Sequence, residues 1–199
     1  MDLSRVAAHA PDAVDGAGQQ AAVLAPILDR GGEPHVLFTR RADHLGEHPG
    51  QMSFPGGSRE PVDPDLRATA LREADEEIGL RAEETRVVGR IDDIETVTDY
   101  SVRPYVARVP DREYDPDERE VAEVVALPVS GLTDLDNYES ERREHPTYGA
   151  RRIHFFHVDG YTVWGATGVM LLQLLELTTD WTVPEEPDRV VDPDAELPV

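Results

Sequence analysis

The chain has 199 residues, of which 39% are apolar, so it is long enough for one compact domain with a sizeable core and cramped for two. Its formal net charge is −22, and every one of its 19 basic residues is an arginine. Because no segment supplies the basic stripe that a phosphate backbone needs, the composition argues against a nucleic-acid partner.

The strong acidity has two candidate explanations, disorder and adaptation to salt. Apolar periodic segments along most of the chain weigh against disorder of the whole. At about 1 M salt the Debye length falls to about 3 Å, so the self-repulsion of such a chain is mostly screened. We therefore expect a protein that works in the cytoplasm of a salt-loving cell and whose unfolding midpoint rises with KCl.

Cysteine is absent, which excludes disulfide bonds and thiolate ligands, so any metal ion must be held by oxygen or imidazole. The N-terminus lacks the basic and then apolar pattern of a secretion signal. The longest apolar stretch, Val169 to Leu177, is shorter than the roughly 20 residues of a membrane span. These features predict a soluble, cytoplasmic protein without a membrane partner.

The first part of the chain predicts an arm, a hairpin and a loop. Residues 1–18 are polar and rich in Ala and Asp, and we expect a short helix or a loose N-terminal arm there. Two apolar runs follow, Ala21 to Leu28 and Pro34 to Thr39, and the Gly-rich turn between them indicates a β-hairpin. From Asp43 to Gly57, repeated Gly and Pro predict a loop whose backbone can approach a ligand closely.

A helix is predicted next, with Asp63 as its N-cap, Pro64 in the first turn and Gly79 as a left-handed C-terminal residue. Spacings of three, four and seven residues place its apolar side chains on one face, toward the core. These side chains are Leu66, Ala70, Leu71, Ala74 and Ile78. The glutamates of the same helix lie on a different face.

The rest of the chain predicts strands and one more helix. The expected strands are Arg86 to Ile91, Val102 to Val109, Val121 to Leu127, Ile153 to Val158 and Tyr161 to Trp164, the last two joined by a turn at Asp159-Gly160. Ala166 to Thr178 is the expected helix, and the acidic, Pro-rich residues 183–199 are expected to form a flexible tail. This order predicts a single domain over residues 19–182, an α/β sandwich with a mixed β-sheet covered by helices.

Three glutamates of the first helix suggest a metal site. Glu73, Glu76 and Glu77 lie at i, i+3 and i+4, so their carboxylates share one face and repel one another by roughly 0.2–0.5 kcal/mol per pair. A hard divalent cation such as Mg²⁺ or Mn²⁺ takes oxygen ligands and would convert that repulsion into attraction. The alternative is a solvated acidic face, which arises readily in a chain with 41 acids. A capped helix, a neighbouring Arg72 and a diglycine turn whose carbonyls can approach the same ion favour the metal site.

The stretch from Gly57 to Leu80 resembles the Nudix box, whose pattern is Gly, five residues, Glu, seven residues and then Arg-Glu-aliphatic-x-Glu-Glu-x-Gly-aliphatic. The second half agrees as Arg72-Glu73-Ala74-Asp75-Glu76-Glu77-Ile78-Gly79-Leu80. The first half departs from the pattern, because Asp63 stands where the first Glu is expected and one extra residue separates it from Arg72.

That extra residue and the segment upstream resemble the coenzyme A pyrophosphatase-like branch of the Nudix hydrolases. The upstream motif of that branch appears here as LFTRRADHLGEHPGQMSFPGG. The residues that fit it are Leu37, Thr39, Arg41, Gly50 and Phe54 to Gly57. Gly46 stands where the motif has a second Arg, so the contact of that Arg is missing or supplied elsewhere. Further similarity in SVRPYVARVP, EREVAEVVALPV and VWGATGVMLLQLLEL extends the resemblance over most of residues 20–177.

The resemblance implies a Nudix-type α/β/α sandwich that hydrolyses the diphosphate bond of coenzyme A, or of a derivative, to 3′-phosphoadenosine 5′-phosphate and 4′-phosphopantetheine. It implies Mg²⁺ or Mn²⁺ held by Glu73 and Glu77 as first-choice ligands, with Glu76 on a second ion or its water shell. The backbone carbonyl of Gly56 or Gly57 would complete the coordination. Cations that bridge the diphosphate oxygens neutralise charge and position an attacking water.

Two further roles need side chains from outside the helix. For the general base the sequence offers a box glutamate or Glu120, which precedes a strand and whose alternative is an ordinary surface acid. Arg40 and Arg41 are the expected phosphate contacts, and Arg41 fits the family pattern better. Because residues alternate across a strand, only one of the two points to the pocket unless the strand has ended.

The histidines are weaker candidates. His44 and His48 share the Gly-rich loop and could touch phosphate or ribose, although a loop histidine is more often a plain surface residue. His154 and His157 on a predicted strand, and Trp164 before the last helix, are expected to be structural.

Other functions stay open beside coenzyme A hydrolysis. The metal site could serve ADP-ribose, a dinucleotide or an oxidised nucleotide, and the glycine at position 46 leaves room for this. A non-catalytic nucleotide-binding or regulatory Nudix domain is disfavoured by the intact Arg-Glu-x-x-Glu-Glu. A third alternative is a salt-adapted structural domain whose acidic helix binds cations only loosely. The expected partner is a small-molecule diphosphate, and a homodimer is compatible with the sequence.

Overall fold

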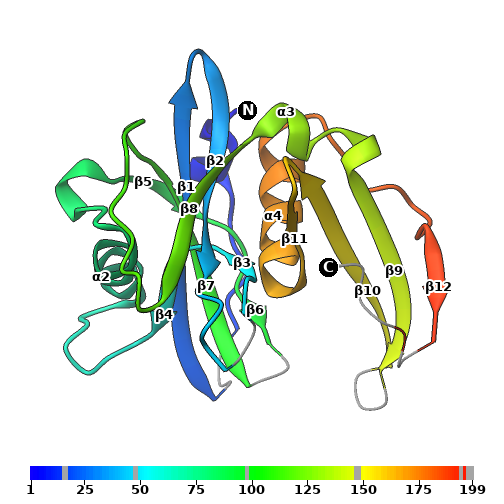
Figure 1. Ribbon diagram of the computed structural model, residues 1–199, viewed down its shortest axis with the longest axis horizontal. Helices are drawn as coiled ribbons and strands as arrows, with labels where there is room; N and C mark the ends of the chain where they lie inside the picture. The colour runs from blue at the N-terminus through cyan, green and yellow to red at the C-terminus, as the bar shows by residue number, and fades with distance from the viewer. Residues whose placement is uncertain (15–17, 47–48, 97–98, 146–148, 193–194, 196–199) are drawn as a thin grey trace.

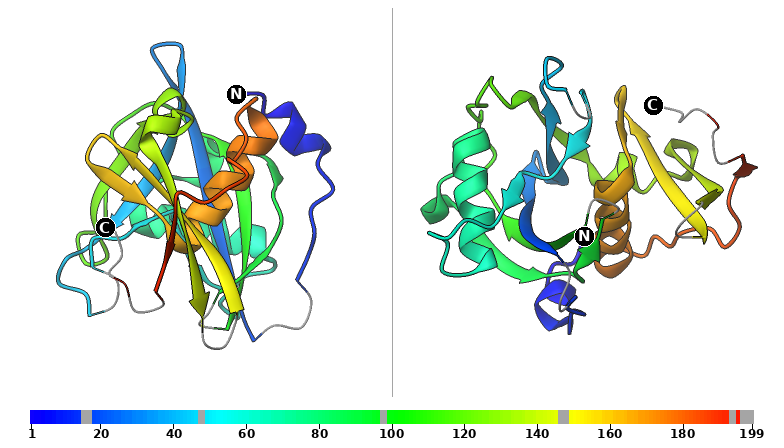
Figure 2. Two further views of the ribbon diagram at one scale, coloured as in Figure 1. Left: turned by 90° about the vertical axis from the view of Figure 1, so that its right-hand side faces the viewer. Right: turned by 90° about the horizontal axis from the view of Figure 1, so that it is seen from below.

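The computed structural model describes residues 1–14, 18–46, 49–96, 99–145, 149–192 and 195. Two β-sheets and two long helices dominate these ranges (Figure 1). One helix covers one face of the larger sheet, and the other helix lies between the two sheets, as the view from below shows (Figure 2). The mixed sheet with helices on both faces confirms the expected α/β/α sandwich. The second sheet was not expected.

The larger sheet is built on two long strands that form the predicted hairpin. Strand β1 (Gln19–Arg30) pairs antiparallel with β2 (Glu33–Arg41) and parallel with β7 (Tyr100–Arg108). Gly31 and Gly32, with φ of 66° and 87°, form the two-residue turn, and positive φ at both positions is what a type I′ hairpin requires.

Shorter strands complete this sheet. They are β3 (Met52–Ser53), β4 (Gly56–Ser58), β5 (Arg86–Arg90), β6 (Ile94–Glu95) and β8 (Val121–Pro128). Strands β3 and β8 both pair with β2, and β4 pairs with β1. The predicted Gly-rich loop therefore contains two short strands, which hold its end against the sheet.

Helix α2 (Leu66–Ile78) is the predicted helix, but it begins two residues later than expected. Asp65, not Asp63, is the N-cap, and its side chain accepts a hydrogen bond from the N–H of Ala68. Gly79 ends the helix with φ of 62°, as predicted. The expected apolar face packs on the sheet, with Leu71 half-buried and the other four side chains buried.

The second sheet has the strand order β11-β10-β9-β12, from β9 (Tyr138–His145), β10 (Gly149–Val158), β11 (Tyr161–Val163) and β12 (Arg189–Val191). The predicted turn at Asp159-Gly160 joins β10 to β11 with positive φ at both residues. Helix α4 (Gly165–Thr178), the predicted last helix, packs between this sheet and the larger one. Short helical segments are α1 (Ser4–Ala8), α3 (Val129–Leu132), η1 (Ala82–Glu84) and η2 (Leu135–Asn137).

The N-terminal arm and residues 183–192 are both attached to the fold. In the N-terminal arm, α1 buries Val6, and the N–H of Asp2 donates to the carbonyl of Thr178 at 2.6 Å. Residues 183–199 were expected to form a flexible tail, but within them Arg189–Val191 form strand β12, which pairs in parallel with β9. Val183 at the start of this segment packs against the core, and the Arg152 guanidinium donates to the carbonyl oxygens of Pro184, Glu185 and Glu186. Most of these contacts are polar, so the apolar pattern of the segment does not predict the attachment.

Candidate active site

Arg72 organises the first half of helix α2. Its guanidinium donates to both carboxylate oxygens of Asp63 at 3.0 and 3.1 Å, to Glu73 at 2.9 Å and to Glu76 at 2.8 Å. It also donates to the carbonyl of Ser58 at 3.2 Å, which ties the helix to the end of β4. Arg72 thus braces three neighbouring carboxylates, those of Asp63, Glu73 and Glu76.

Asp63 takes the position of the expected first glutamate of the box, although it lies one residue further from Arg72. Its side chain is 4% exposed and also accepts hydrogen bonds from the N–H of Glu60 and the hydroxyl of Thr69. The bonds from the Arg72 guanidinium lower the pKa of Asp63 to about 2. Asp63 is therefore an ionised anchor for Arg72 and not the helix cap.

Glu73 lies directly against the diglycine turn. A Cβ added to Gly57 would sit 2.7 Å from the Glu73 carboxylate, so a glycine is needed there for the two to approach. Burial raises the pKa of Glu73, and Arg72 opposes that shift. Gly57 and Glu73 thus bring a backbone segment and a partly buried carboxylate to one place.

Glu77 is the most strongly perturbed carboxylate of the helix. The N–H of Gly56 donates to its Oε2 at 3.3 Å. Burial raises the pKa of Glu77 to about 8, and the negative charges of Glu73 and Glu120 act in the same direction. At Gly56 an added Cβ would lie 2.4 Å from the carbonyl oxygen of Ala22, so only glycine lets the turn reach β1 and Glu77 together.

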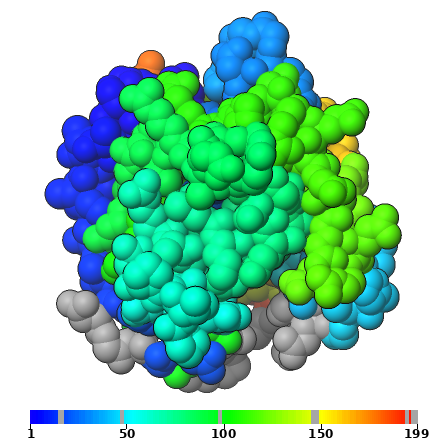
Figure 3. Space-filling model, turned by 90° about the vertical axis from the view of Figure 1, so that its left-hand side faces the viewer, coloured from blue at the N-terminus to red at the C-terminus, as the bar shows by residue number. Residues whose placement is uncertain are grey.

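Glu120 belongs to a different segment, and its charge acts on both Glu73 and Glu77. The segment before β8 covers the end of α2, where the N–H of Asp117 donates to the carbonyl of Glu77 at 2.9 Å. Figure 3 looks onto this face, with the α2 region in teal at its centre and the green segment beside it. Glu120 is exposed, and its charge raises the pKa of both Glu73 and Glu77.

The two arginines at the end of β2, Arg40 and Arg41, have different neighbours. The positive charge of Arg41 opposes the rise in the pKa of Glu77, so the Arg41 side chain lies near the glutamate cluster. Arg40 pairs with Asp43 at 2.8 Å and lies 3.7 Å from Glu123. The register with β8 shifts between the two arginines, so strand alternation does not decide which of them faces the pocket. Arg41 stays the predicted phosphate contact.

The remaining candidates are more exposed or lie elsewhere in the fold. The Glu76 side chain is 61% exposed and is held by Arg72, and His44 is exposed. His48 lies outside the described residues. In the second sheet, His154 accepts or donates a hydrogen bond at Nδ1 with the Tyr138 hydroxyl at 2.7 Å, a structural contact as expected.

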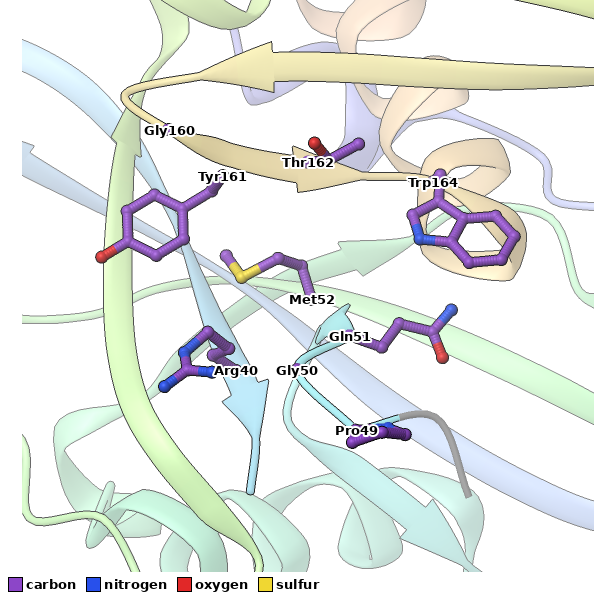
Figure 4. Close-up of a pocket in the computed structure, with 9 residues that line it drawn as sticks. All are labelled: Arg40, Pro49, Gly50, Gln51, Met52, Gly160, Tyr161, Thr162 and Trp164. Atoms are coloured by element: carbon purple, nitrogen blue, oxygen red, sulfur yellow. The ribbon is translucent and has the colours of Figure 1, made fainter. Parts of the chain in front are cut away.

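One set of residues was missed by sequence reasoning. Trp164, expected to be a core residue, lines a cavity of about 520 Å³ together with Tyr161 and Arg40 (Figure 4). These residues are far apart along the chain, and an aromatic residue in a predicted strand gives no signal that distinguishes a cavity wall from a core position.

The glutamate cluster can be tested for its fit to a metal ion. Within the described ranges, no three acid or imidazole side chains already converge closely enough to hold one. The donors nevertheless suit a hard cation, which takes carboxylate oxygens, a backbone carbonyl and water. Two of the carboxylates have pKa values raised by burial, and a nearby cation would stabilise their ionised forms.

Comparison with known proteins agrees with this geometry. Residues 18–158 match the NUDIX domain family. A protein from Enterobacter sp. (strain 638), described as the uncharacterized Nudix hydrolase NudL, is 38% identical over 160 residues, or 78% of this chain and 81% of that protein. A NudL from Yersinia pestis (strain Pestoides F) is 36% identical over 161 residues, or 79% of each chain.

A solved structure shows the same fold. The crystal structure of the Nudix hydrolase RenU from M. smegmatis superimposes with a TM-score of 0.50 at 22% identity, covering 61% of this chain and 84% of that one. Among the described residues, no helix is both long and apolar enough to cross a membrane. Nudix hydrolases in general use divalent metal ions. The chain is a member of the Nudix hydrolase family, which confirms the family, the fold class and the diphosphate-hydrolase type of enzyme that its sequence predicts.

Proposed function

We propose that this protein hydrolyses the diphosphate bond of coenzyme A or of one of its derivatives, with Mg²⁺ or Mn²⁺, giving 3′-phosphoadenosine 5′-phosphate and 4′-phosphopantetheine. The observation that carries the hydrolase chemistry is the gathering of Glu73, Glu77 and Glu120 at the diglycine turn. The substrate rests on the motif from Leu37 to Gly57 and is supported by its resemblance to the coenzyme A branch.

The helix and the turn supply the metal ligands. Glu73 and Glu77 hold the cation with the carbonyl of Gly57 or Gly56, and Glu76 contributes through a second ion or a water shell. When bound, the cation neutralises the diphosphate oxygens and lowers the pKa of a coordinated water. Arg72 keeps Glu73 in place, because its guanidinium is itself fixed by Asp63.

The attacking water needs a base and the diphosphate needs a cationic contact. Glu120 is the proposed general base, with a box glutamate as the alternative: it takes a proton from the water as the water oxygen bonds to phosphorus and the bridging P–O bond breaks. Arg41, whose charge acts on Glu77, is the proposed contact to the diphosphate. Arg40, the residue before it, is a weaker candidate for the same role.

A second candidate substrate is ADP-ribose or another nucleoside diphosphate derivative. Gly46, at the position where the coenzyme A motif has an arginine, favours it, because one cationic contact of that motif is absent. A nucleotide-binding Nudix domain without turnover is the remaining alternative, and the intact set of box glutamates argues against it.

The test is an incubation in molar KCl with Mg²⁺ or Mn²⁺ and a panel of diphosphate compounds, followed by chromatography of the products. Coenzyme A should yield the two named products, and Glu77→Gln should abolish the reaction. Glu83→Gln is the matched control, because Glu83 is a 73% exposed acid just beyond the helix. Hydrolysis of ADP-ribose alone would favour the second substrate, and binding of a nucleotide without hydrolysis would favour the non-catalytic domain.

The setting of the reaction is part of the proposal. The net charge of −22 supports work in a salt-rich cytoplasm, where ions screen the self-repulsion of the chain. Light scattering in molar KCl measures the mass of the particle and so tests for the homodimer with which the sequence is compatible.

A further inference from the structure

A cavity of about 520 Å³ opens beside the Gly-rich loop, on the side of the second sheet (Figure 4). Its volume is within the range of small-molecule sites. The loop before β3 and the β10–β11 hairpin form its walls. It is lined by Arg40, Pro49, Gly50, Gln51, Met52, Gly160, Tyr161, Thr162 and Trp164.

The cavity is close to the glutamate cluster along two segments of chain. Met52 lies four residues before Gly56, so even an extended chain places them at most about 14 Å apart. Arg40, which lines the cavity, directly precedes Arg41, whose charge acts on Glu77. A substrate whose diphosphate lies at the glutamates can therefore extend one of its arms into this cavity.

The walls suit a flat, uncharged group. The side chain of Met52 lies between Tyr161 and Trp164, which approach from the hairpin (Figure 4). Trp164 stacks against Phe155 with ring centroids 6.1 Å apart, and the Tyr161 hydroxyl donates to Glu123 at 2.9 Å, so both aromatic rings are held in place. Fixed aromatic side chains and a thioether form a surface on which a nucleobase stacks.

The charge of the cavity disfavours a phosphate. Arg40 is the one cationic side chain among its described lining residues, and it is shared by Asp43 at 2.8 Å and Glu123 at 3.7 Å. One positive and two negative charges leave a net charge of −1 beside the cavity. Gly46 adds no cation at the position where the coenzyme A motif has an arginine.

We propose that this cavity receives the nucleobase of the substrate and gives no advantage to a phosphate on the ribose 3′ position. The inference rests on the proposed function in that the substrate is a nucleoside diphosphate derivative. Within that class, the inference adds compounds without the 3′-phosphate, such as 3′-dephospho-coenzyme A, to the substrates. We expect these compounds to bind at least as well as coenzyme A.

Tryptophan fluorescence provides a binding test that does not need turnover. The chain has two tryptophans, and Trp181 is 9% exposed, so Trp164 is the one placed to report a ligand. We expect AMP to quench the fluorescence of the metal-free protein, adenosine 3′,5′-bisphosphate to bind no more tightly, and 4′-phosphopantetheine to leave the signal unchanged. Trp164→Phe should abolish the quenching, while the remaining signal of Trp181 reports that the protein is folded.

Asp43→Asn tests the charge argument. The Asp43 side chain is 72% exposed, so its replacement leaves the fold intact and frees part of the charge of Arg40. At the lowest salt at which the protein stays folded, affinity for the bisphosphate relative to AMP should rise by up to about fivefold. Asp111→Asn, which removes a similar exposed partner from Arg30, is the control and should leave the ratio unchanged.

Two results would overturn the inference. One is quenching by 4′-phosphopantetheine and not by AMP, which would assign the cavity to the other arm of the substrate. The other is binding of the bisphosphate severalfold tighter than AMP by the protein without substitutions. Failure of the proposed function is seen separately, because a protein that binds AMP at Trp164 but does not cleave coenzyme A keeps the cavity assignment and loses the substrate.

Discussion

Replacing Asp63 by Asn should weaken the fold by removing the most deeply buried of the three carboxylates that pair with Arg72. Asn keeps the size of the side chain, and its one oxygen can replace Oδ2 and accept from Glu60, Thr69 and the Arg72 bond at 3.1 Å. Its NH2 then faces the Arg72 Nε–H, so the 3.0 Å bond is lost together with the ionic part of the other. Because Asp63 is 4% exposed and Arg72 is 20% exposed, water cannot fully replace that interaction.

The magnitude follows from the pKa of Asp63. A fall from 3.8 to about 2 on folding corresponds to a contribution of about 2 kcal/mol to the free energy of unfolding. Because the pKa is lowered in the folded protein, this contribution is complete above about pH 5 and is lost as the pH falls through about 2. The difference in stability between the protein and Asp63→Asn should therefore be about 2 kcal/mol at pH 7 and about half of that at pH 3.

Urea unfolding at a fixed KCl concentration, repeated from pH 7 to pH 3, measures this difference. Asp65→Asn is the matched control, because it removes the same charge from the same loop while asparagine is as good an N-cap as aspartate. If Asp63→Asn is as stable as this control at pH 7, the Asp63–Arg72 pair does not anchor the helix.

Four further outcomes are expected. Gly57→Ala should abolish hydrolysis with little loss of helix content by circular dichroism, because its Cβ would lie 2.7 Å from the Glu73 carboxylate; activity near that of the parent protein would contradict the close approach. Glu120→Gln should cut turnover while sparing metal affinity measured by calorimetry, and unchanged turnover would remove Glu120 as the base. Burial lowers the pKa of His154 to about 4, so the protein should lose about 2 kcal/mol of stability, after allowance for partial exposure, as the pH falls from 6.5 to 4; His154→Asn, which keeps a hydrogen-bonding group for Tyr138 but does not titrate, should lack this loss. Unfolding midpoints should rise from low to molar KCl, and a flat or falling series would count against salt adaptation.

Periodicity made much of the fold predictable from the sequence. Helix α2 has apolar residues at helical spacing, and the β1–β2 hairpin consists of two short apolar runs joined by a Gly-rich turn. The Asp159-Gly160 turn was predicted for the same reason. The start of the helix was misplaced because Asp63 and Asp65 are equally good caps by type, and only the tertiary contact with Arg72 distinguishes them.

Strand β9 shows why other elements could not be predicted. Its sequence, YESERREH, has no apolar alternation, yet Ser140, Glu141 and Arg143 are all buried. Glu141 and Arg143 neutralise one another through a buried ion pair, and the Glu141 carboxylate also lies 2.9 Å from Arg189 of β12. A buried face made of paired charges carries no hydrophobic signal, so both strands of this edge are invisible to pattern reasoning.

The candidate site divides in the same way. The box glutamates and the diglycine turn lie within one continuous stretch, so their meeting could be predicted. Glu120 was one of two kinds of candidate for the base, chosen for its position before a strand, and nothing in its own segment distinguishes it from a surface acid. Its electrostatic effect on Glu73 and Glu77 comes from tertiary structure that the sequence does not reveal. The cavity at Trp164 lies between residues 160–164 and the much earlier Arg40 and residues 49–52. No local sequence pattern predicts that these segments meet.

Within helix α2, the carboxylates differ in what neutralises them, and this difference bears on function. Glu73 and Glu76 are paired with Arg72, which is itself anchored by Asp63. Among the described residues Glu77 has the Gly56 N–H as its hydrogen-bond donor and no ion-pair partner, although burial raises its pKa to about 8. A buried carboxylate without an ion-pair partner destabilises a fold when it ionises, so Glu77 is the carboxylate of this helix that the proposed cation would stabilise most. Asp63, Glu73 and Glu76 share the single positive charge of Arg72, so this part of the helix keeps an excess of negative charge, which the proposed divalent ion would neutralise together with an ionised Glu77.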